Sequence, residues 1–137
     1  MSDAVNHPTH YNSHPSGIEC IEVAELYGFN IGNAIKYIWR AGLKGGEDKL
    51  EQDLKKAIFY VNRQLPLGDA VSRRFGILER KQIDSIKQSI LIGFDSPEVR
   101  GAMNALLSLR YPSLNAGRSL LHTASLHLQK ELENYGH

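Results

Sequence analysis

Apolar residues recur every three or four positions along most of the chain, which is the spacing that places them on one side of an α-helix. No stretch alternates between apolar and polar residues as a half-buried strand would. The predicted fold class is therefore all-α, as a compact three-helix N-terminal module followed by about three further helices. The helices are expected at about 18–27, 31–41, 47–65, 78–92, 97–109 and 116–135.

Capping residues predict where the N-terminal helices begin and end. Ser16 followed by Glu19, just before an apolar run, is a capping-box pattern for the first helix. Asn30 is expected to cap the helix that starts near Ile31, and Gly42 is expected to end that helix. The third helix should end at a proline, at position 66.

The chain divides into three parts by composition. Residues 1–17 are rich in Asn, His, Pro, Ser and Thr and predict an irregular arm. Residues 18–66 form the helical module, and residues 67–137 form a helical extension that completes the core or an oligomer interface. A three-helix unit of about 60 residues is marginal by itself. Amphipathic helices with Leu and Ile stripes favour self-association, so we expect a homo-oligomer.

Composition narrows the class of protein. The chain has 137 residues, 42% of them hydrophobic and 23% charged, which is typical of a globular domain. The net charge of +1 argues against a dedicated nucleic-acid binder. The single Cys20 excludes an intrachain disulfide and fits a reducing compartment. Without a signal peptide or an apolar run of about 20 residues, the expected location is the cytoplasm, away from any membrane.

The second helix carries a polar face with the chemistry for binding phosphates. Asn33, Lys36, Tyr37 and Arg40 lie at i, i+3, i+4 and i+7, so they share one side of the helix, and Lys44 follows just beyond it. Cations beside an amide and a phenol suit the oxygens of a phosphate chain, Arg above all by its fork geometry. The alternative is an ordinary solvated face of an amphipathic helix.

The third helix has a similar polar face. Asp53, Lys56 and Tyr60 share one side of it. Asp53 is a candidate base or metal-anchoring carboxylate, and Lys56 is a candidate phosphate contact. The alternative is an exposed ion pair of small energy.

Two further groups complete the candidate chemistry. Glu19 and Glu22 are three residues apart on the first helix, and such a pair can hold Mg²⁺ directly or through water. Glu19 has an alternative role as the capping partner of Ser16. His10 and Tyr11 are expected to fold over the site as part of the arm.

Four segments together resemble a small phage-encoded family. The family is typified by a podophage nucleotide kinase that lacks a P-loop and phosphorylates dTMP and dGMP. This chain likewise has no G-x-x-x-x-G-K-[ST] motif. Order and spacing are kept over about residues 5–65, whereas residues 67–137 show no resemblance. The segments are HPTHY (7–11), GIECIEV (17–23), GNAIKYIWRAGLK (32–44) and LEQDLKKAIFY (50–60).

The resemblance implies a kinase that transfers a phosphoryl group from ATP or another nucleoside triphosphate to deoxynucleoside monophosphates with Mg²⁺. It also implies a nucleotide ligand and the cytoplasm of an infected bacterial host. The residues at matching positions are given these roles: catalytic, Lys36, Arg40 and Asp53; substrate-binding, His10, Tyr11, Asn33, Tyr37, Lys44, Lys56 and Tyr60; metal-binding, Glu19 and Glu22.

Two other functions remain open. The same cationic face would serve a non-catalytic protein that sequesters a host nucleotide signal or blocks a host protein. An all-α nucleotide pyrophosphohydrolase of the MazG type also sets helix-borne carboxylates around Mg²⁺. Such enzymes carry E-x-x-E and E-x-x-D pairs; Glu19 and Glu22 satisfy the first, and no E-x-x-D follows.

Overall fold

The computed structural model describes residues 14–43, 47–67, 77–109 and 114–135, and these residues form helices joined by turns. The predicted all-α class is confirmed. The elements are α2 (Cys20–Ala24), α3 (Phe29–Leu43), α4 (Glu47–Gln64), a 3₁₀ turn (Leu65–Leu67), α5 (Ile77–Leu91), α6 (Pro97–Leu107) and α7 (Leu114–Tyr135).

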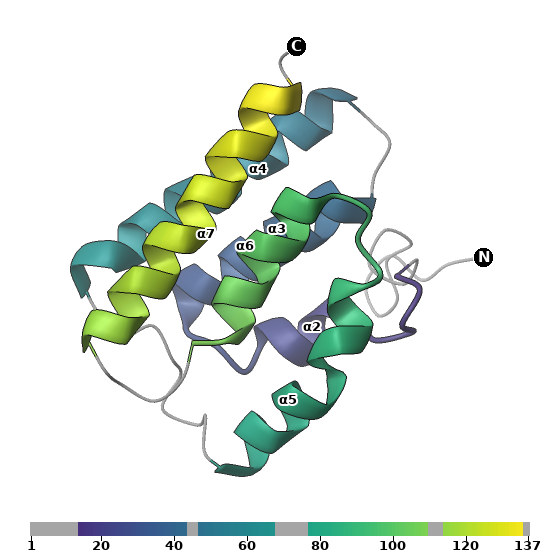
Figure 1. Ribbon diagram of the computed structural model, residues 1–137, viewed down its shortest axis with the longest axis vertical. Helices are drawn as coiled ribbons and strands as arrows, with labels where there is room; N and C mark the ends of the chain where they lie inside the picture. The colour runs from purple at the N-terminus through teal and green to yellow at the C-terminus, as the bar shows by residue number, and fades with distance from the viewer. Residues whose placement is uncertain (1–13, 44–46, 68–76, 110–113, 136–137) are drawn as a thin grey trace.

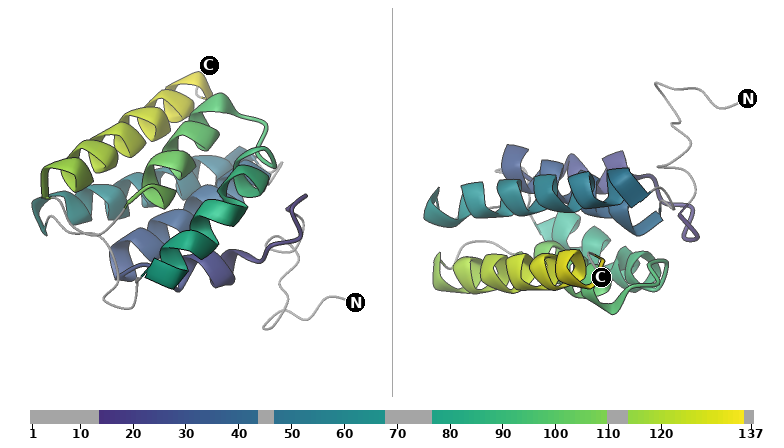
Figure 2. Two further views of the ribbon diagram at one scale, coloured as in Figure 1. Left: turned by 60° about the horizontal axis from the view of Figure 1, so that its bottom comes forward. Right: turned by 90° about the horizontal axis from the view of Figure 1, so that it is seen from above.

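The helices form two layers, which the right-hand view of Figure 2 shows edge-on. Helices α3 and α4 lie side by side in one layer, and α6 and α7 lie side by side in the other (Figure 1). Helix α4 packs on α7 and α3 packs on α6, while α2 packs on α3 and α5 on α6. One apolar core therefore joins the N-terminal module to the C-terminal helices.

The core consists of large side chains that both layers contribute. Trp39 of α3 lies edge-on to Phe94, with ring centroids 5.7 Å apart. Tyr27, just before α3, donates a hydrogen bond from its hydroxyl to the carbonyl oxygen of Leu107 in α6 (3.3 Å). Burying each Leu, Ile or Phe side chain contributes roughly 1.5–3 kcal/mol to stability. The largest fully buried side chains are Trp39, Phe94, Ile31, Ile35, Ile38, Leu54, Ile83, Ile90, Met103, Leu106 and Leu107.

The first capping prediction is wrong by one turn. The capping box of α2 is formed by Glu19 and Glu22, and the Glu19 backbone N–H donates to Glu22 Oε2 (3.0 Å). Ser16 Oγ instead accepts a hydrogen bond within its own turn, from the backbone N–H of Ile18 (3.1 Å). Both pairs have the same spacing, and helix α2 starts only at Cys20, so the second pair is at the helix terminus.

The predicted boundaries of the next helix also differ from the structure. Helix α3 begins at Phe29, so Asn30 lies inside its first turn and donates from Nδ2 to Gln64 Oε1 (3.0 Å) instead of capping the helix. Gly42 does not end the helix but lies within it. A Cβ at Gly42 would overlap the ring of Phe94, so the glycine permits the close approach of α3 to the other layer.

A buried histidine joins the start of the described chain to the end of α5. The His14 ring packs against Trp39 and Phe94, with centroids 4.8 Å from each. Its Nε2 donates to the carbonyl oxygen of Ile90 (2.9 Å), which leaves Nδ1 to accept from the hydroxyl and backbone N–H of Ser16. The pKa of His14 is lowered by burial, with the hydrogen bond to Ile90 acting in the opposite direction.

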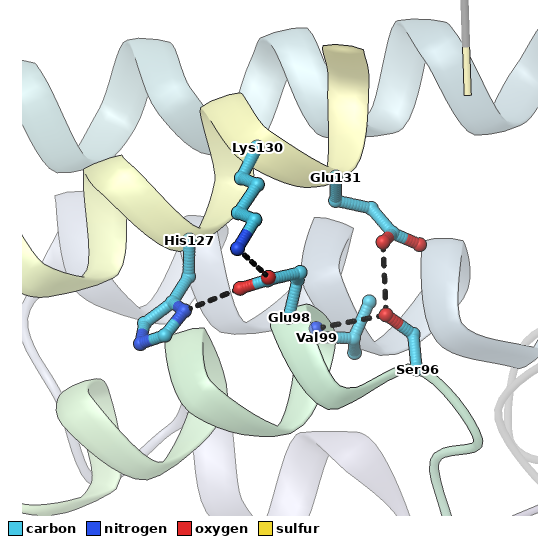
Figure 3. A network of polar contacts seen from close by, with 6 residues as sticks. All are labelled: Ser96, Glu98, Val99, His127, Lys130 and Glu131. Carbon is cyan, nitrogen blue, oxygen red and sulfur yellow. Dashed lines mark hydrogen bonds and ion pairs between the residues drawn. The ribbon is translucent and has the colours of Figure 1, made fainter. Parts of the chain in front are cut away.

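A polar network fastens α6 to α7 (Figure 3). Ser96 caps α6 by accepting a hydrogen bond from the Val99 backbone N–H (3.2 Å), ahead of Pro97 at the first helical position. We call the side chains that join the two helices here the α6–α7 cluster: Ser96, Glu98, His127, Lys130 and Glu131.

No helix in the described ranges combines the length and the apolar character that crossing a membrane requires.

Candidate functional site

The polar face of α3 lies opposite its buried face, as the helical period predicts. Ile31, Ala34 and Ile38 are fully buried, whereas Lys36 and Tyr37 are half-buried on the other side. This face is covered in part by α4, because α3 and α4 pack along one another. Residues on the polar faces of two helices are therefore brought within contact distance.

The two tyrosines predicted on separate helices stack on each other. The rings of Tyr37 in α3 and Tyr60 in α4 are nearly parallel, with an angle of 5° and a centroid separation of 6.0 Å. Both side chains are half-buried and lie against the edge of the hydrophobic core. The core thus fixes one side of each ring and leaves the rest at the surface.

Three cations gather around Tyr37. Lys36 Nζ lies 4.5 Å from its ring centroid, Lys56 Nζ lies 5.3 Å away, and Arg40 Cζ lies 6.0 Å away. Cation–π attraction offsets part of the repulsion between these like charges. We call the side chains that meet here the α3–α4 cluster: Lys36, Tyr37, Arg40, Asp53, Lys56 and Tyr60.

Arg40 and Asp53 form an ion pair without a hydrogen bond. Arg40 Nε lies 3.6 Å from Asp53 Oδ2, and the two side chains are 22% and 3% exposed. At this distance the charges attract, but the contact is too long for a hydrogen bond. Both atoms are buried, and neither has a hydrogen-bond partner among the described residues. Most buried polar groups in proteins are satisfied, so this pair marks the cluster as unusual.

Asn33 lies one turn before Lys36 and Tyr37 on the same face. Its Nδ2 donates to the carbonyl oxygen of Phe29 (2.8 Å), so part of its amide is used within α3. The structure therefore places Asn33 beside the α3–α4 cluster and not within it. A role in substrate binding stays a prediction.

Glu19 and Glu22 are used at the start of α2. Both take part in its capping box, so each carboxylate accepts a backbone N–H hydrogen bond there. No group of three or more His, Cys, Asp or Glu side chains that could hold a metal ion is found in the described ranges. Metal binding by Glu19 and Glu22 stays a prediction. His10, Tyr11 and Lys44 lie outside the described residues.

Cys20 is buried at the start of α2. Burial raises the pKa of its thiol to about 12, and the nearby positive charge of Lys36 acts in the opposite direction. The thiol is therefore protonated at neutral pH and unsuited to nucleophilic chemistry.

Two exposed aromatic residues at the cluster were missed by the sequence reasoning. Phe29 and Phe59 both lie edge-on to Tyr60, with centroid separations of 6.0 Å and 5.2 Å. The helical period offered a signal for Phe29, because it lies four residues before Asn33 and so shares the polar face of α3. Phe59 neighbours Tyr60 in sequence, and only the exposure of its ring sets it apart from a core residue.

Comparisons with known proteins concern the same part of the chain. Residues 5–62 match a family described as a protein of unknown function, DUF3310. The "Gene 1.7 protein" of Enterobacteria phage T3 is 41% identical over 63 residues, which cover 41% of this chain. The chain spans 38% of the length of that relative, and no solved structure matches. The segment that carries the α3–α4 cluster is thus similar to a family of unknown function that occurs in phage.

Proposed function

We propose that this chain is a phage nucleotide-binding protein that transfers a phosphoryl group to deoxynucleoside monophosphates. The observation that carries the proposal is the α3–α4 cluster, in which three cations surround Tyr37 and Tyr37 stacks on Tyr60. A nucleotide offers a matching partner for each part of the cluster: an anionic phosphate group for the cations and a flat aromatic base for the rings. The sequence resemblance to a kinase without a P-loop adds the reaction and the substrate class.

The cations would hold the phosphate oxygens. A guanidinium group offers paired donors that match phosphate geometry, and lysine adds a mobile point charge. Phosphoryl transfer depends more on positioning and charge neutralisation than on covalent steps by the protein. In this proposal Arg40, Lys36 and Lys56 bind phosphates, while Lys44, His10 and Tyr11 keep the substrate contacts expected from the sequence.

Asp53 would act by orienting Arg40. Its carboxylate is almost fully buried and faces Nε of the guanidinium, so the charge attraction holds that edge inward. The remaining N–H groups of Arg40 are then available to an anion.

A panel assay tests the proposal. Each deoxynucleoside monophosphate is incubated with ATP or dTTP and Mg²⁺, and diphosphate formation is followed by chromatography. We expect turnover by the wild-type protein and its loss in Arg40→Ala, with a helical circular-dichroism spectrum in both. Arg63→Ala is the matched control, because Arg63 is an exposed arginine near the end of α4. Turnover unchanged by Arg40→Ala would remove Arg40 from the site.

The second candidate is a non-catalytic nucleotide binder. It is favoured by the use of Glu19 and Glu22 as helix caps, because this gives the carboxylate pair a structural role. Nucleotide binding that persists in excess EDTA, without turnover in the panel, would support this candidate over the kinase. The same capping role weakens the MazG-type alternative, whose E-x-x-E pair is formed by these two residues.

A further inference from the structure

The most exposed aromatic side chains described in this protein converge on one residue of the site. Phe29 is 75% exposed and Phe59 is 59% exposed, although they come from different helices. Both rings meet the ring of Tyr60 edge-on, at interplanar angles of 74° and 83°. Single exposed apolar residues are common, but two phenylalanines against one half-buried tyrosine form a continuous aromatic surface.

The fold does not account for this exposure. Neither phenylalanine belongs to the buried core or to the partly buried residues packed against it, whereas Tyr37 and Tyr60 do. Among the residues that the structure describes, the other large exposed apolar side chains are aliphatic: Ile21, Leu67, Ile92 and Leu126. The exposed phenylalanines of these ranges are thus concentrated where α3 and α4 meet, beside the cations.

Across this surface, the positive charges lie at one end and the exposed aromatic rings at the other. The cations surround Tyr37, Tyr37 stacks on Tyr60, and Tyr60 contacts both phenylalanines. The charged end can neutralise a phosphate group, and the opposite end offers ring faces and edges. Nucleobases bind well to such rings, since every base has a π-face that can stack on an aromatic side chain.

We infer that Phe29 and Phe59, together with Tyr60, bind the base of a nucleotide whose phosphate lies at Lys36, Arg40 and Lys56. The inference rests on the proposed function and adds two specificity-determining residues to it. Selection is for the presence of an aromatic base and not for its hydrogen-bonding edge. The site therefore distinguishes a nucleotide from a sugar phosphate of the same charge.

The size of the effect follows from base stacking. The stacking of a base on an aromatic side chain raises the binding affinity roughly 5- to 150-fold. We expect wild-type protein to bind deoxynucleoside monophosphates more tightly than 2-deoxyribose 5-phosphate by a factor in this range. Replacing a phenylalanine should reduce this preference while leaving the affinity for 2-deoxyribose 5-phosphate unchanged.

The experiment measures the affinities of both compounds by calorimetry for the wild type and four variants. Phe59→Leu and Phe29→Leu each keep apolar volume and remove a ring, whereas Phe59→Trp keeps an aromatic face at position 59. Ile92→Ala is the control, because Ile92 is as exposed as Phe29 and lies after α5. We expect the preference for the base-bearing compound to fall in Phe59→Leu, to be kept in Phe59→Trp, and to be unchanged in Ile92→Ala.

Each contrary result has a separate meaning. If Phe59→Leu keeps the full preference and Phe29→Leu does too, the inference is overturned while the proposed function stands. If wild-type protein binds neither compound, the proposed function fails and the inference fails with it. A fall in molecular mass of the Phe59→Leu protein by light scattering, with nucleotide affinity unchanged, would instead make this surface a contact between copies of the chain and overturn the inference.

Discussion

The α3–α4 cluster and the α6–α7 cluster contain similar side chains but satisfy them in opposite ways. In the α6–α7 cluster, His127 Nδ1 donates to Glu98 Oε1 (2.6 Å) and Lys130 lies 3.3 Å from Glu98 Oε2 (Figure 3). Ser96 donates from its hydroxyl to Glu131 Oε1 (2.9 Å). Each carboxylate there has a close partner from the other helix, so the cluster is complete without a ligand.

In the α3–α4 cluster the paired charges of Arg40 and Asp53 attract each other but form no hydrogen bond. Arg40 Nε and Asp53 Oδ2 are separated by 3.6 Å and are buried without hydrogen-bond partners among the described residues. An unsatisfied buried polar group costs about 1–3 kcal/mol. Natural proteins keep such costs mainly at functional sites. The contrast supports the proposal that the α3–α4 cluster binds a ligand, whereas the α6–α7 cluster is satisfied within the fold.

The largest expected effect comes from removing the unsatisfied pair altogether. The double variant Arg40→Met with Asp53→Leu keeps similar side-chain shapes and removes both charges. Replacing a buried ion pair by apolar residues is often neutral or stabilising, so we expect an unfolding free energy unchanged or raised by about 1 kcal/mol. Nucleotide affinity should fall on the order of 100-fold, because hydrogen bonds to charged groups are lost.

Urea denaturation and calorimetric titration measure the two quantities for this double variant. A large loss of stability would show that the Arg40–Asp53 pair is structural, like the α6–α7 cluster. Nucleotide affinity equal to that of the wild type would remove the pair from the site. Either result would break the contrast between the two regions.

A smaller effect of the opposite kind is expected in the α6–α7 cluster. Glu98→Ala removes the acceptor of both His127 and Lys130 from a side chain that is only 14% exposed. We expect a loss of about 1–2 kcal/mol in the free energy of unfolding, which lowers Tm by several degrees, with unchanged nucleotide affinity. Glu133→Ala is the control, since this exposed glutamate of α7 should change stability by less than about 0.5 kcal/mol. Equal Tm values for the two variants would contradict the structural role of Glu98.

The two regions also differ in how well the sequence predicts them. The cap of α6 at Ser96 follows from adjacent residues, because Ser96 directly precedes Pro97 at the first helical position. The faces of α3 and α4 were each predicted from the helical period. Their meeting was not, because the register of one helix against another depends on core packing, including the close approach at Gly42. The stacking of Tyr37 on Tyr60 therefore had no local signal.

Other errors arose where one pattern fits two places. The spacing of Ser16 and Glu19 is the same as that of Glu19 and Glu22, and only the start of α2 at Cys20 decides between them. Exposure is equally hard to predict from the helical period alone. Phe59 has the side chain of a core residue, and the orientation of α4 against α3 and α7 is what leaves it at the surface.

The smallest expected effect concerns His14, a polar group whose state is set by burial as well as by its partners. Its pKa is lowered in the folded protein, so the unfolded chain binds a proton first as the pH falls below about 6.5. The contribution of neutral His14 to the free energy of unfolding is therefore fully present above that pH. This contribution is lost as the pH falls toward the pKa that His14 has in the folded protein. The slope from one such proton is at most about 1.4 kcal/mol per pH unit.

His14→Gln isolates this contribution, because glutamine keeps a donor that can reach the carbonyl oxygen of Ile90 and does not titrate. Urea denaturation at several pH values between 7 and 5 gives the free energy of unfolding for both proteins. We expect the wild type to lose stability faster than the variant as the pH falls, whatever the variant's stability at pH 7. Parallel pH profiles would mean that His14 is protonated equally in the folded and unfolded states. In that case the connection between the start of the described chain and α5 would depend on the hydrogen bond from Nε2 to Ile90, and not on the ring being uncharged.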